Sequence, residues 1–223
     1  MSIGIAVVGN GFVLAGADSR SFWTDESVGK DSVEKMFCAE IEGKPFVIAI
    51  AGEAEINGKP TIEIVRSISK TTTRIEFESK ITQCFRDEWT IHFNNYPWES
   101  PAEKKEECES VIVELLIIDA PTIVSVIRVR PLKFEKSPFC QGWTNYPIGK
   151  LNSISHLLEQ SQPRNLDSAS QFLANMLDCV CENEKSCGYP ITFLYWAEGN
   201  KPKFAMVSEG ARICATAKEL AQN

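Results

Sequence analysis

The chain has 223 residues, of which 43% are hydrophobic and 24% are charged, a composition that is ordinary for a globular protein. Its net charge of −7 argues against nucleic acid or an anionic membrane as the main partner. No apolar run approaches the roughly 20 residues that span a bilayer. The apolar N-terminus lacks a basic region and is interrupted by Gly9-Asn10-Gly11, so it does not resemble a signal peptide. We therefore expect a cytoplasmic protein that forms one domain over residues 1–223.

The eight cysteines are scattered along the chain without a C-x-x-C pair. Because no secretion signal is present, we expect them to be reduced and mostly buried. The spacing of Cys179, Cys181 and Cys187 matches no common zinc framework. The sequence therefore predicts neither a metal site nor another cofactor.

Two consecutive β-hairpins are predicted for the first fifty residues, because short apolar runs flank strong turn signals. A polar, irregular stretch over 18–31 separates them. The predicted strands are 2–8 and 12–17 around Gly9-Asn10-Gly11, then 35–41 and 45–52 around Glu42-Gly43-Lys44.

Helices and further hairpins alternate in the remainder of the chain. Apolar residues at spacings of three and four predict helix within 61–93, whereas the polar, proline-containing stretch 94–109 predicts a surface connection. The clearest helix is 167–182, with an apolar stripe and Asp167 as a plausible N-cap. The other predicted elements are a hairpin over 111–134 that turns near Asp119-Ala120-Pro121, a helix over 151–160, a hairpin over 191–207 and a helix in the tail 211–223.

This order of strand blocks and helix blocks favours an α+β fold of two antiparallel sheets with helix layers outside, a four-layer αββα sandwich. The usual catalytic motifs are missing from the sequence. The two histidines, His92 and His156, lie in predicted helices, and there is no G-x-S-x-G, H-E-x-x-H, P-loop or G-x-G-x-x-G motif in a suitable context. Catalysis based on histidine is therefore not indicated.

Ser2 has another way to become a nucleophile. Removal of Met1 would leave Ser2 with both a hydroxyl and a free α-amine, whose ordinary pKa is about 7.7–8.0. Such an amine can accept the hydroxyl proton while the oxygen attacks a carbonyl carbon. Serine after Met is common, so Ser2 alone is weak evidence, and retention of Met1 would cap the amine and stop the mechanism.

The sequence around Ser2 strengthens this interpretation. Five segments, in this order, resemble those of proteasome-type peptidase subunits. They are SIGIAVV, GFVLAGADSR, Lys35 in SVEKMF, Ala51-Gly52 in IAIAGEAE, and Ser186-Cys187-Gly188 before ITFLYW. These subunits are N-terminal-nucleophile hydrolases and include the catalytic β-subunits and the related bacterial ring peptidases. The resemblance is specific over the first fifty-five residues and rests mainly on element order beyond them.

The resemblance implies a role for each matching residue. Ser2 would be the nucleophile, with its α-amine as general base, and Lys35 would lie beside it with Asp18 holding the ammonium. The N–H of Gly52 would donate to the oxyanion, and Ser186 would hydrogen-bond near the α-amine. Arg20 would brace the loop between strands.

Three positions depart from the family pattern. The usual nucleophile is threonine, the family's acid falls on Asn183, and the Gly-Ser-Gly-Ser segment appears only as Ile148-Gly149-Lys150-Leu151. The resemblance implies peptide or unfolded protein as substrate, a homo-oligomeric ring and a separate ATPase unfoldase. Two alternatives remain open: a non-catalytic structural or gating subunit of such a ring, and a small-molecule amidase on the same fold.

Overall fold

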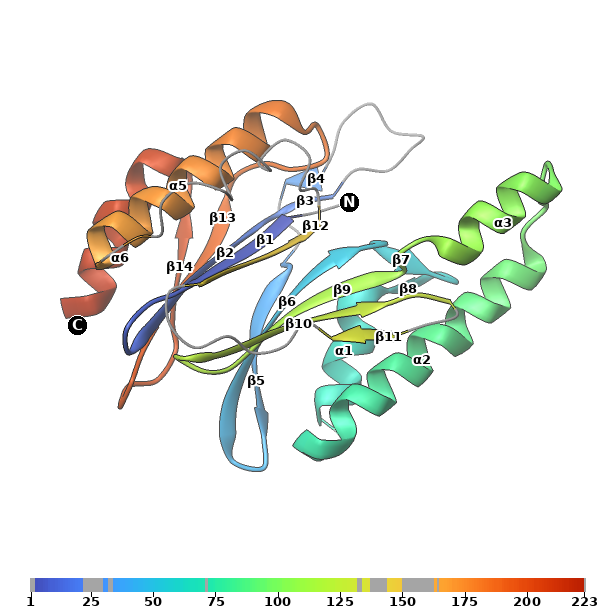
Figure 1. Ribbon diagram of the computed structural model, residues 1–223, viewed down its shortest axis with the longest axis horizontal. Coiled ribbons are helices and arrows are strands. Elements are labelled where there is room, and N and C mark those ends of the chain that lie inside the picture. The colour runs from blue at the N-terminus through green and yellow to red at the C-terminus, as the bar shows by residue number, and fades with distance from the viewer. Residues whose placement is uncertain are drawn as a thin grey trace.

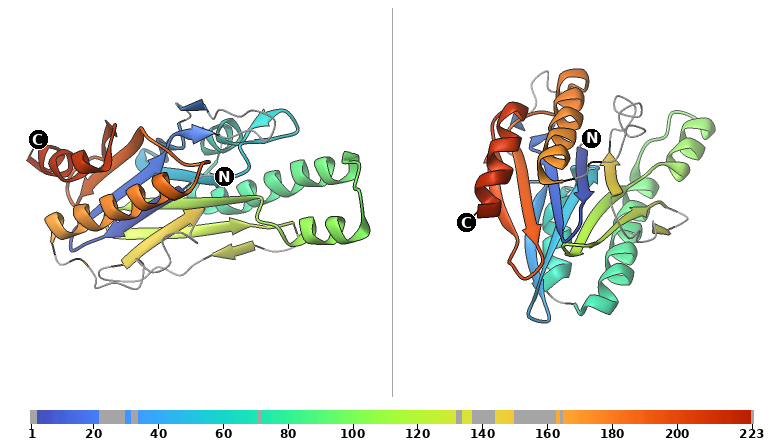
Figure 2. Two further views of the ribbon diagram at one scale, coloured as in Figure 1. Left: turned by 90° about the horizontal axis from the view of Figure 1, so that it is seen from above. Right: turned by 60° about the vertical axis from the view of Figure 1, so that its left-hand side comes forward.

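The computed structural model describes residues 3–21, 30–31, 34–70, 72–131, 134–136, 144–149, 163 and 165–222. Two five-stranded antiparallel sheets face each other, with helices on their outer sides (Figures 1 and 2). This arrangement confirms the predicted α+β sandwich.

The first sheet has the strand order β12-β1-β2-β13-β14. The apolar strands β1 and β2 form a hairpin at its centre, and Gly11 turns the chain with a φ of 78°. The pairing of Ile191 with Asp18 places the start of β13 beside the end of β2. The strands are β1 (Ile3–Val8), β2 (Phe12–Asp18), β12 (Thr144–Gly149), β13 (Ile191–Ala197) and β14 (Lys203–Val207).

The second sheet has the order β11-β10-β9-β6-β5. Its first hairpin turns through Glu42 and Gly43, both with positive φ. The strands are β5 (Met36–Ile41), β6 (Lys44–Gly52), β9 (Val113–Ala120), β10 (Ile123–Val129) and β11 (Phe134–Lys136). Short paired strands accompany the two main sheets: β3 (Arg20–Ser21) with β4 (Lys30–Asp31), and β7 (Glu55–Ile56) with β8 (Lys59–Pro60).

Three apolar clusters hold the four layers together. Side chains of both sheets fill the space between them, among them Val13, Met36, Val47, Leu116 and Trp196. The outer face of the first sheet packs against α5 (Leu166–Asn183) and α6 (Ile213–Gln222), which follows the short helix η2 (Gly210–Arg212). The outer face of the second sheet packs against α1 (Thr61–Lys70) and α2 (Arg74–Asn95).

The structure corrects several expectations from the sequence. The stretch expected to be a surface connection contains α3 (Pro101–Glu109), which starts at the N-cap Ser100 and has no buried residue. Helix α5 is capped by Asn165 rather than Asp167, because the Asn165 side chain accepts a hydrogen bond from the Ser168 N–H. Strand β12 was not predicted, and the helix expected over 151–160 lies outside the described residues.

The cysteines are less buried than expected. The seven described cysteines are free, and among them Cys187 alone is buried, while Cys140 lies outside the described residues. Within the described ranges no three or more His, Cys, Asp or Glu side chains gather in a way that could hold a metal ion. The described helices include none with the length and apolar character needed to cross a membrane.

Candidate functional site

Asp18 is the last residue of β2, and its carboxylate collects three hydrogen bonds from different parts of the chain. The Ile3 N–H donates to Oδ1 over 2.9 Å, and the Arg20 N–H donates to Oδ2 over 3.2 Å. The ammonium of Lys35 donates to Oδ2 over 2.8 Å. Asp18 therefore joins the beginning of the first strand to a cation that precedes β5.

Lys35 reaches Asp18 from the second sheet. Its backbone carbonyl accepts a hydrogen bond of 2.8 Å from the Ile50 N–H, which fixes its backbone against β6. Its ammonium also donates to the carbonyl oxygen of Arg20. The side chains of Lys35 and Asp18 are 8% and 0% exposed, so water competes little with this ion pair.

Opposing effects act on the pKa of Asp18. Burial raises the pKa of Asp18, because the charged carboxylate loses its hydration. The charge of Lys35 and the N–H groups of Ile3 and Arg20 act against this rise. Removal of any one of these donors would therefore favour the neutral acid and weaken the hold on the lysine.

Arg20 holds the Ser186 segment, residues 186–188, next to the Asp18–Lys35 pair. Its guanidinium donates to the carbonyl oxygen of Cys187 over 3.1 Å, and the Ser19 N–H donates to the carbonyl oxygen of Gly188 over 3.3 Å. A Cβ at Gly188 would lie 2.4 Å from the Arg20 guanidinium carbon, so a larger residue there would displace the arginine side chain from this contact. The sequence predicted that Arg20 braces a loop between strands, and the contact observed here is instead with the segment between α5 and β13.

The Cys187 thiol lies close enough to the ion pair for the charges of Asp18 and Lys35 to affect its pKa. Burial, and then the negative charge of Asp18, raise its pKa to about 12, although Lys35 and a hydrogen bond with Ser186 oppose the rise. Ser186 itself is half-buried. The structure therefore brings the Ser186 segment next to Asp18 and Lys35.

Gly52 ends β6, opposite Val113 of β9. Its φ of 124° is unfavourable for other residues, and a Cβ there would lie 2.6 Å from the Ile112 carbonyl oxygen. This position needs glycine for backbone reasons alone. Its expected donation to an oxyanion therefore stays a prediction, as does the role of Ser2, which lies outside the described residues.

The sequence reasoning missed Glu114, which links the two sheets. Glu114 stands opposite Ala51, is 8% exposed, and accepts hydrogen bonds from Arg128 and from the Gly149 N–H. Gly149 in turn pairs with Ile3. The available signal was a single carboxylate inside the apolar run VIVELLII, with one arginine in the facing strand.

Other candidate residues lie apart from the pair. The Asn183 amide donates to the Cys179 carbonyl oxygen over 2.7 Å and stays on the surface of α5. His92 lies on α2 beside the ring of Tyr96, and His156 lies outside the described residues. Among the described residues, His92 therefore does not lie at the Asp18–Lys35 pair. Asn183, where the resemblance predicted an acid, does not lie there either.

The comparisons with known proteins show the fold. No family model matches the chain, and no curated protein matches it. A solved structure of Anbu (ancestral beta-subunit) from Yersinia bercovieri matches with a TM-score of 0.64 and 14% identity, over 99% of this chain and 94% of that chain. Anbu from Hyphomicrobium sp. strain MC1 matches with a TM-score of 0.63 and 11% identity, over 99% and 95%.

A third similar structure is the helical assembly of the Anbu complex from Pseudomonas aeruginosa. It has a TM-score of 0.66 and 13% identity, and the match covers 99% of this chain and 92% of that chain. At such low identity, the likeness establishes the fold only. It also corrects the family assignment drawn from the sequence: the similar structures are Anbu proteins, and the assignment to proteasome-type peptidase subunits is wrong.

Proposed function

We propose that this chain is an N-terminal-nucleophile hydrolase that cleaves peptide or other amide bonds with Ser2 after removal of Met1. The observation that supports the proposal is the carboxylate of Asp18, which accepts hydrogen bonds from both the Ile3 N–H and the Lys35 ammonium. Ser2 is joined covalently to Ile3. The Lys35 ammonium is thus held by the same carboxylate as the N–H of the residue that follows Ser2, which supports a role for Lys35 beside this nucleophile.

The chemistry needs no histidine. The neutral α-amine of Ser2 accepts the proton of the Ser2 hydroxyl, and the oxygen attacks the carbonyl carbon of the substrate. The charge of Lys35 stabilises the negative charge that develops on the nucleophile. The Gly52 N–H donates to the oxyanion of the tetrahedral intermediate, and the protonated amine gives its proton to the leaving nitrogen, which leaves an ester on the Ser2 oxygen. Water, deprotonated by the same α-amine, then cleaves this ester, releases the carboxylic acid and restores the Ser2 hydroxyl.

Assembly is the second part of the proposal. The similar structure from Pseudomonas aeruginosa is a helical assembly, which supports self-association of chains with this fold. We expect a homo-oligomer of the 24.9 kDa chain that receives unfolded protein from a separate ATPase. Light scattering coupled to size exclusion would show a multiple of the chain mass, and a monomer at micromolar concentration would contradict this part.

One observation favours the non-catalytic alternative. The position at which the sequence resemblance predicted an acid is Asn183, whose amide donates a hydrogen bond to the Cys179 carbonyl oxygen of its own helix. In a structural or gating subunit, the Asp18–Lys35 pair would serve only to hold the sheets together. Such a subunit would assemble normally and would show no turnover in the wild-type chain.

The proposed hydrolase is tested with a panel of fluorogenic peptide amides and single amino-acid amides. Ser2→Ala should abolish turnover and Ser2→Thr should preserve it, while Ser79→Ala on the exposed face of α2 serves as the control. Preference for single amino-acid amides over peptides would identify a small-molecule amidase. Full activity of Ser2→Ala would exclude Ser2 as the nucleophile.

A further inference from the structure

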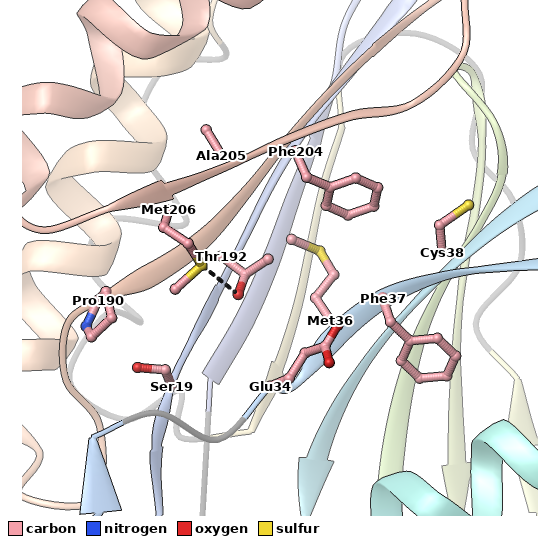
Figure 3. A pocket seen from close by; sticks show the side chains of 10 residues that line it. All are labelled: Ser19, Glu34, Met36, Phe37, Cys38, Pro190, Thr192, Phe204, Ala205 and Met206. Carbon is pink, nitrogen blue, oxygen red and sulfur yellow. Dashed lines mark hydrogen bonds between the residues drawn. The ribbon is translucent and has the colours of Figure 1, made fainter.

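A cavity of about 520 Å³ opens between the two sheets at their β5 and β14 edges. Figure 3 shows its lining side chains, which come from both sheets and from the segments next to the ion pair. Its volume is in the range that holds small organic ligands. The lining residues are Ser19, Glu34, Met36, Phe37, Cys38, Pro190, Thr192, Phe204, Ala205 and Met206.

The cavity contains a buried hydroxyl that lacks a partner. Ser19 is 1% exposed, and within the described part of the chain its Oγ makes no hydrogen bond. Burial of a hydroxyl without a partner is unfavourable, so an unpartnered hydroxyl on a cavity wall favours a molecule in the cavity that can hydrogen-bond to it. Ser19 therefore points to a polar atom supplied by a ligand.

A second hydroxyl in the cavity is only weakly satisfied. Thr192 Oγ1 donates to the Met206 sulfur over 3.5 Å, and a thioether is a poor acceptor. Thr192 pairs with Ala17 in the first sheet, two residues before Ser19, so both hydroxyls lie at the same end of the β2–β13 ladder. A single polar group of a ligand would find both of them there.

The rest of the lining is apolar and rich in sulfur and aromatic rings. Met36 belongs to β5, and Phe204 and Met206 face it from β14, whereas the ring of the neighbouring Phe37 lies on the helix side of the sheet under the Arg66 guanidinium (Figure 3). Phe204 and Met206 are 36% and 61% exposed, so a ligand can reach both side chains. Thioethers make favourable contacts with aromatic rings, so these walls fit a flat aromatic body.

The charged groups at the cavity already have partners. The Glu34 carboxylate forms an ion pair with Arg66, and Asp18, next to Ser19, is paired with Lys35. A charged ligand would lose hydration without gaining a counter-ion among the described lining residues. The ligand should therefore be neutral.

We propose that this cavity binds a neutral aromatic molecule that carries one hydroxyl group, an alkylphenol or the side chain of a tyrosine, with that hydroxyl bonded to Ser19. The ring lies between the Met36 side and the Phe204–Met206 side. The proposal concerns binding alone and does not depend on the nucleophile, so loss of turnover in Ser2→Ala would not affect it.

The test is NMR of the full chain labelled at the methionine methyl groups, titrated with 4-propylphenol and with propylbenzene. Met36 and Met206 line the cavity, whereas Met176 belongs to α5, is buried against the first sheet, and serves as an internal control. We expect shifts at Met36 and Met206 and roughly tenfold tighter binding of the phenol, the gain of one well-formed hydrogen bond. Equal affinities for the two compounds, or shifts confined to Met176, would overturn the proposal.

Two variants separate recognition from folding. Ser19→Ala should abolish the preference for the phenol, while Ser125→Ala, a buried serine of β10 away from the cavity, should keep it. Ser19→Ala should also melt no lower than the wild type, because the removed hydroxyl has no partner. A markedly lower melting temperature, or an unchanged preference, would show that the Ser19 hydroxyl is not the ligand contact.

A second pair of probes, N-acetyltyrosine amide and N-acetylphenylalanine amide, tells whether the bound hydroxyl belongs to a tyrosine side chain or to a free phenol. Preferential binding of the tyrosine compound at Met36 and Met206 would identify a peptide side chain as an occupant. Binding of 4-propylphenol without the tyrosine compound would restrict the site to free phenols. Failure of both phenolic probes to bind would overturn the proposal.

Discussion

Asp18 and Glu114 are both buried carboxylates that connect the two sheets, yet their surroundings differ. Asp18 accepts hydrogen bonds from two backbone N–H groups and from a lysine that is 8% exposed. Glu114 accepts from one backbone N–H and from Arg128, whose side chain is 28% exposed. The cavity and the unpartnered Ser19 lie beside the first carboxylate.

The difference separates a structural ion pair from a candidate site. Arg128 stands directly opposite Glu114 in neighbouring strands, so sheet pairing alone explains their contact. Lys35 and Asp18 come from different sheets, and a third segment at Cys187 is fastened beside them. Several segments also meet at Glu114, so convergence on a buried charge does not by itself indicate function; the cavity and the Ser19 hydroxyl beside Asp18 are what set it apart.

The largest difference between the two pairs should appear in turnover. Lys35→Met and Arg128→Met each remove the cation from a buried carboxylate and keep an apolar side chain. If the proposed function holds, Lys35→Met should lower kcat/KM by at least about 100-fold, and Arg128→Met by less than about tenfold. Equal losses in the two variants would place catalysis elsewhere.

Stability should respond to both pairs. Asp18→Ala and Glu114→Ala each remove the carboxylate that faces a cation and accepts from the backbone, and each should cost about 3–5 kcal/mol of unfolding free energy. Urea unfolding measures this loss, with Asp18→Asn as a control that keeps the acceptor for the Ile3 N–H. A loss below about 1 kcal/mol would show that the carboxylate is not desolvated as the structure indicates.

The backbone near these carboxylates should tolerate substitution less than the distant turn. Gly52→Ala combines a positive φ with a Cβ 2.6 Å from the Ile112 carbonyl oxygen, whereas Gly43→Ala has a positive φ and no atom within 4 Å. We expect a loss of about 2–4 kcal/mol for Gly52→Ala and about 1 kcal/mol for Gly43→Ala. Similar melting temperatures for the two variants would contradict the crowding at Gly52.

The smallest effect should be seen in cysteine alkylation. The exposed Cys38 should react first with iodoacetamide, and Cys187 should react slowly because its raised pKa, about 12, keeps the thiol protonated at neutral pH. The rate at Cys187 should still be rising above pH 9. Asp18→Asn should increase this rate by removing a neighbouring negative charge, and Glu114→Gln should leave it unchanged; identical rates in both variants would contradict the placement of Cys187.

The sequence predicted those parts of the fold whose signals are local. The first two hairpins were found because glycine turns separate short apolar runs. Helix α3 was missed because none of its residues is buried, so it has no apolar period. The N-cap of α5 was placed two residues late because both Asn165 and Asp167 are suitable capping residues.

The candidate site was predicted only in part. The Asp18–Lys35 contact came from a family resemblance, because nothing local in the sequence indicates that these residues meet. Glu114 was missed because its partner Gly149 is 35 residues away. The Ser19 hydroxyl lacks a hydrogen-bond partner because of how the two sheets pack, and no sequence pattern predicts this.

The most direct test of the account is the intact mass of the purified protein before and after treatment with a β-lactone that acylates hydroxyl nucleophiles. The account predicts loss of Met1 and a single adduct on Ser2, formed in the wild type and in Arg128→Met but strongly reduced in Lys35→Met. Retention of Met1 with no adduct would contradict it, and the Asp18–Lys35 pair would then be purely structural.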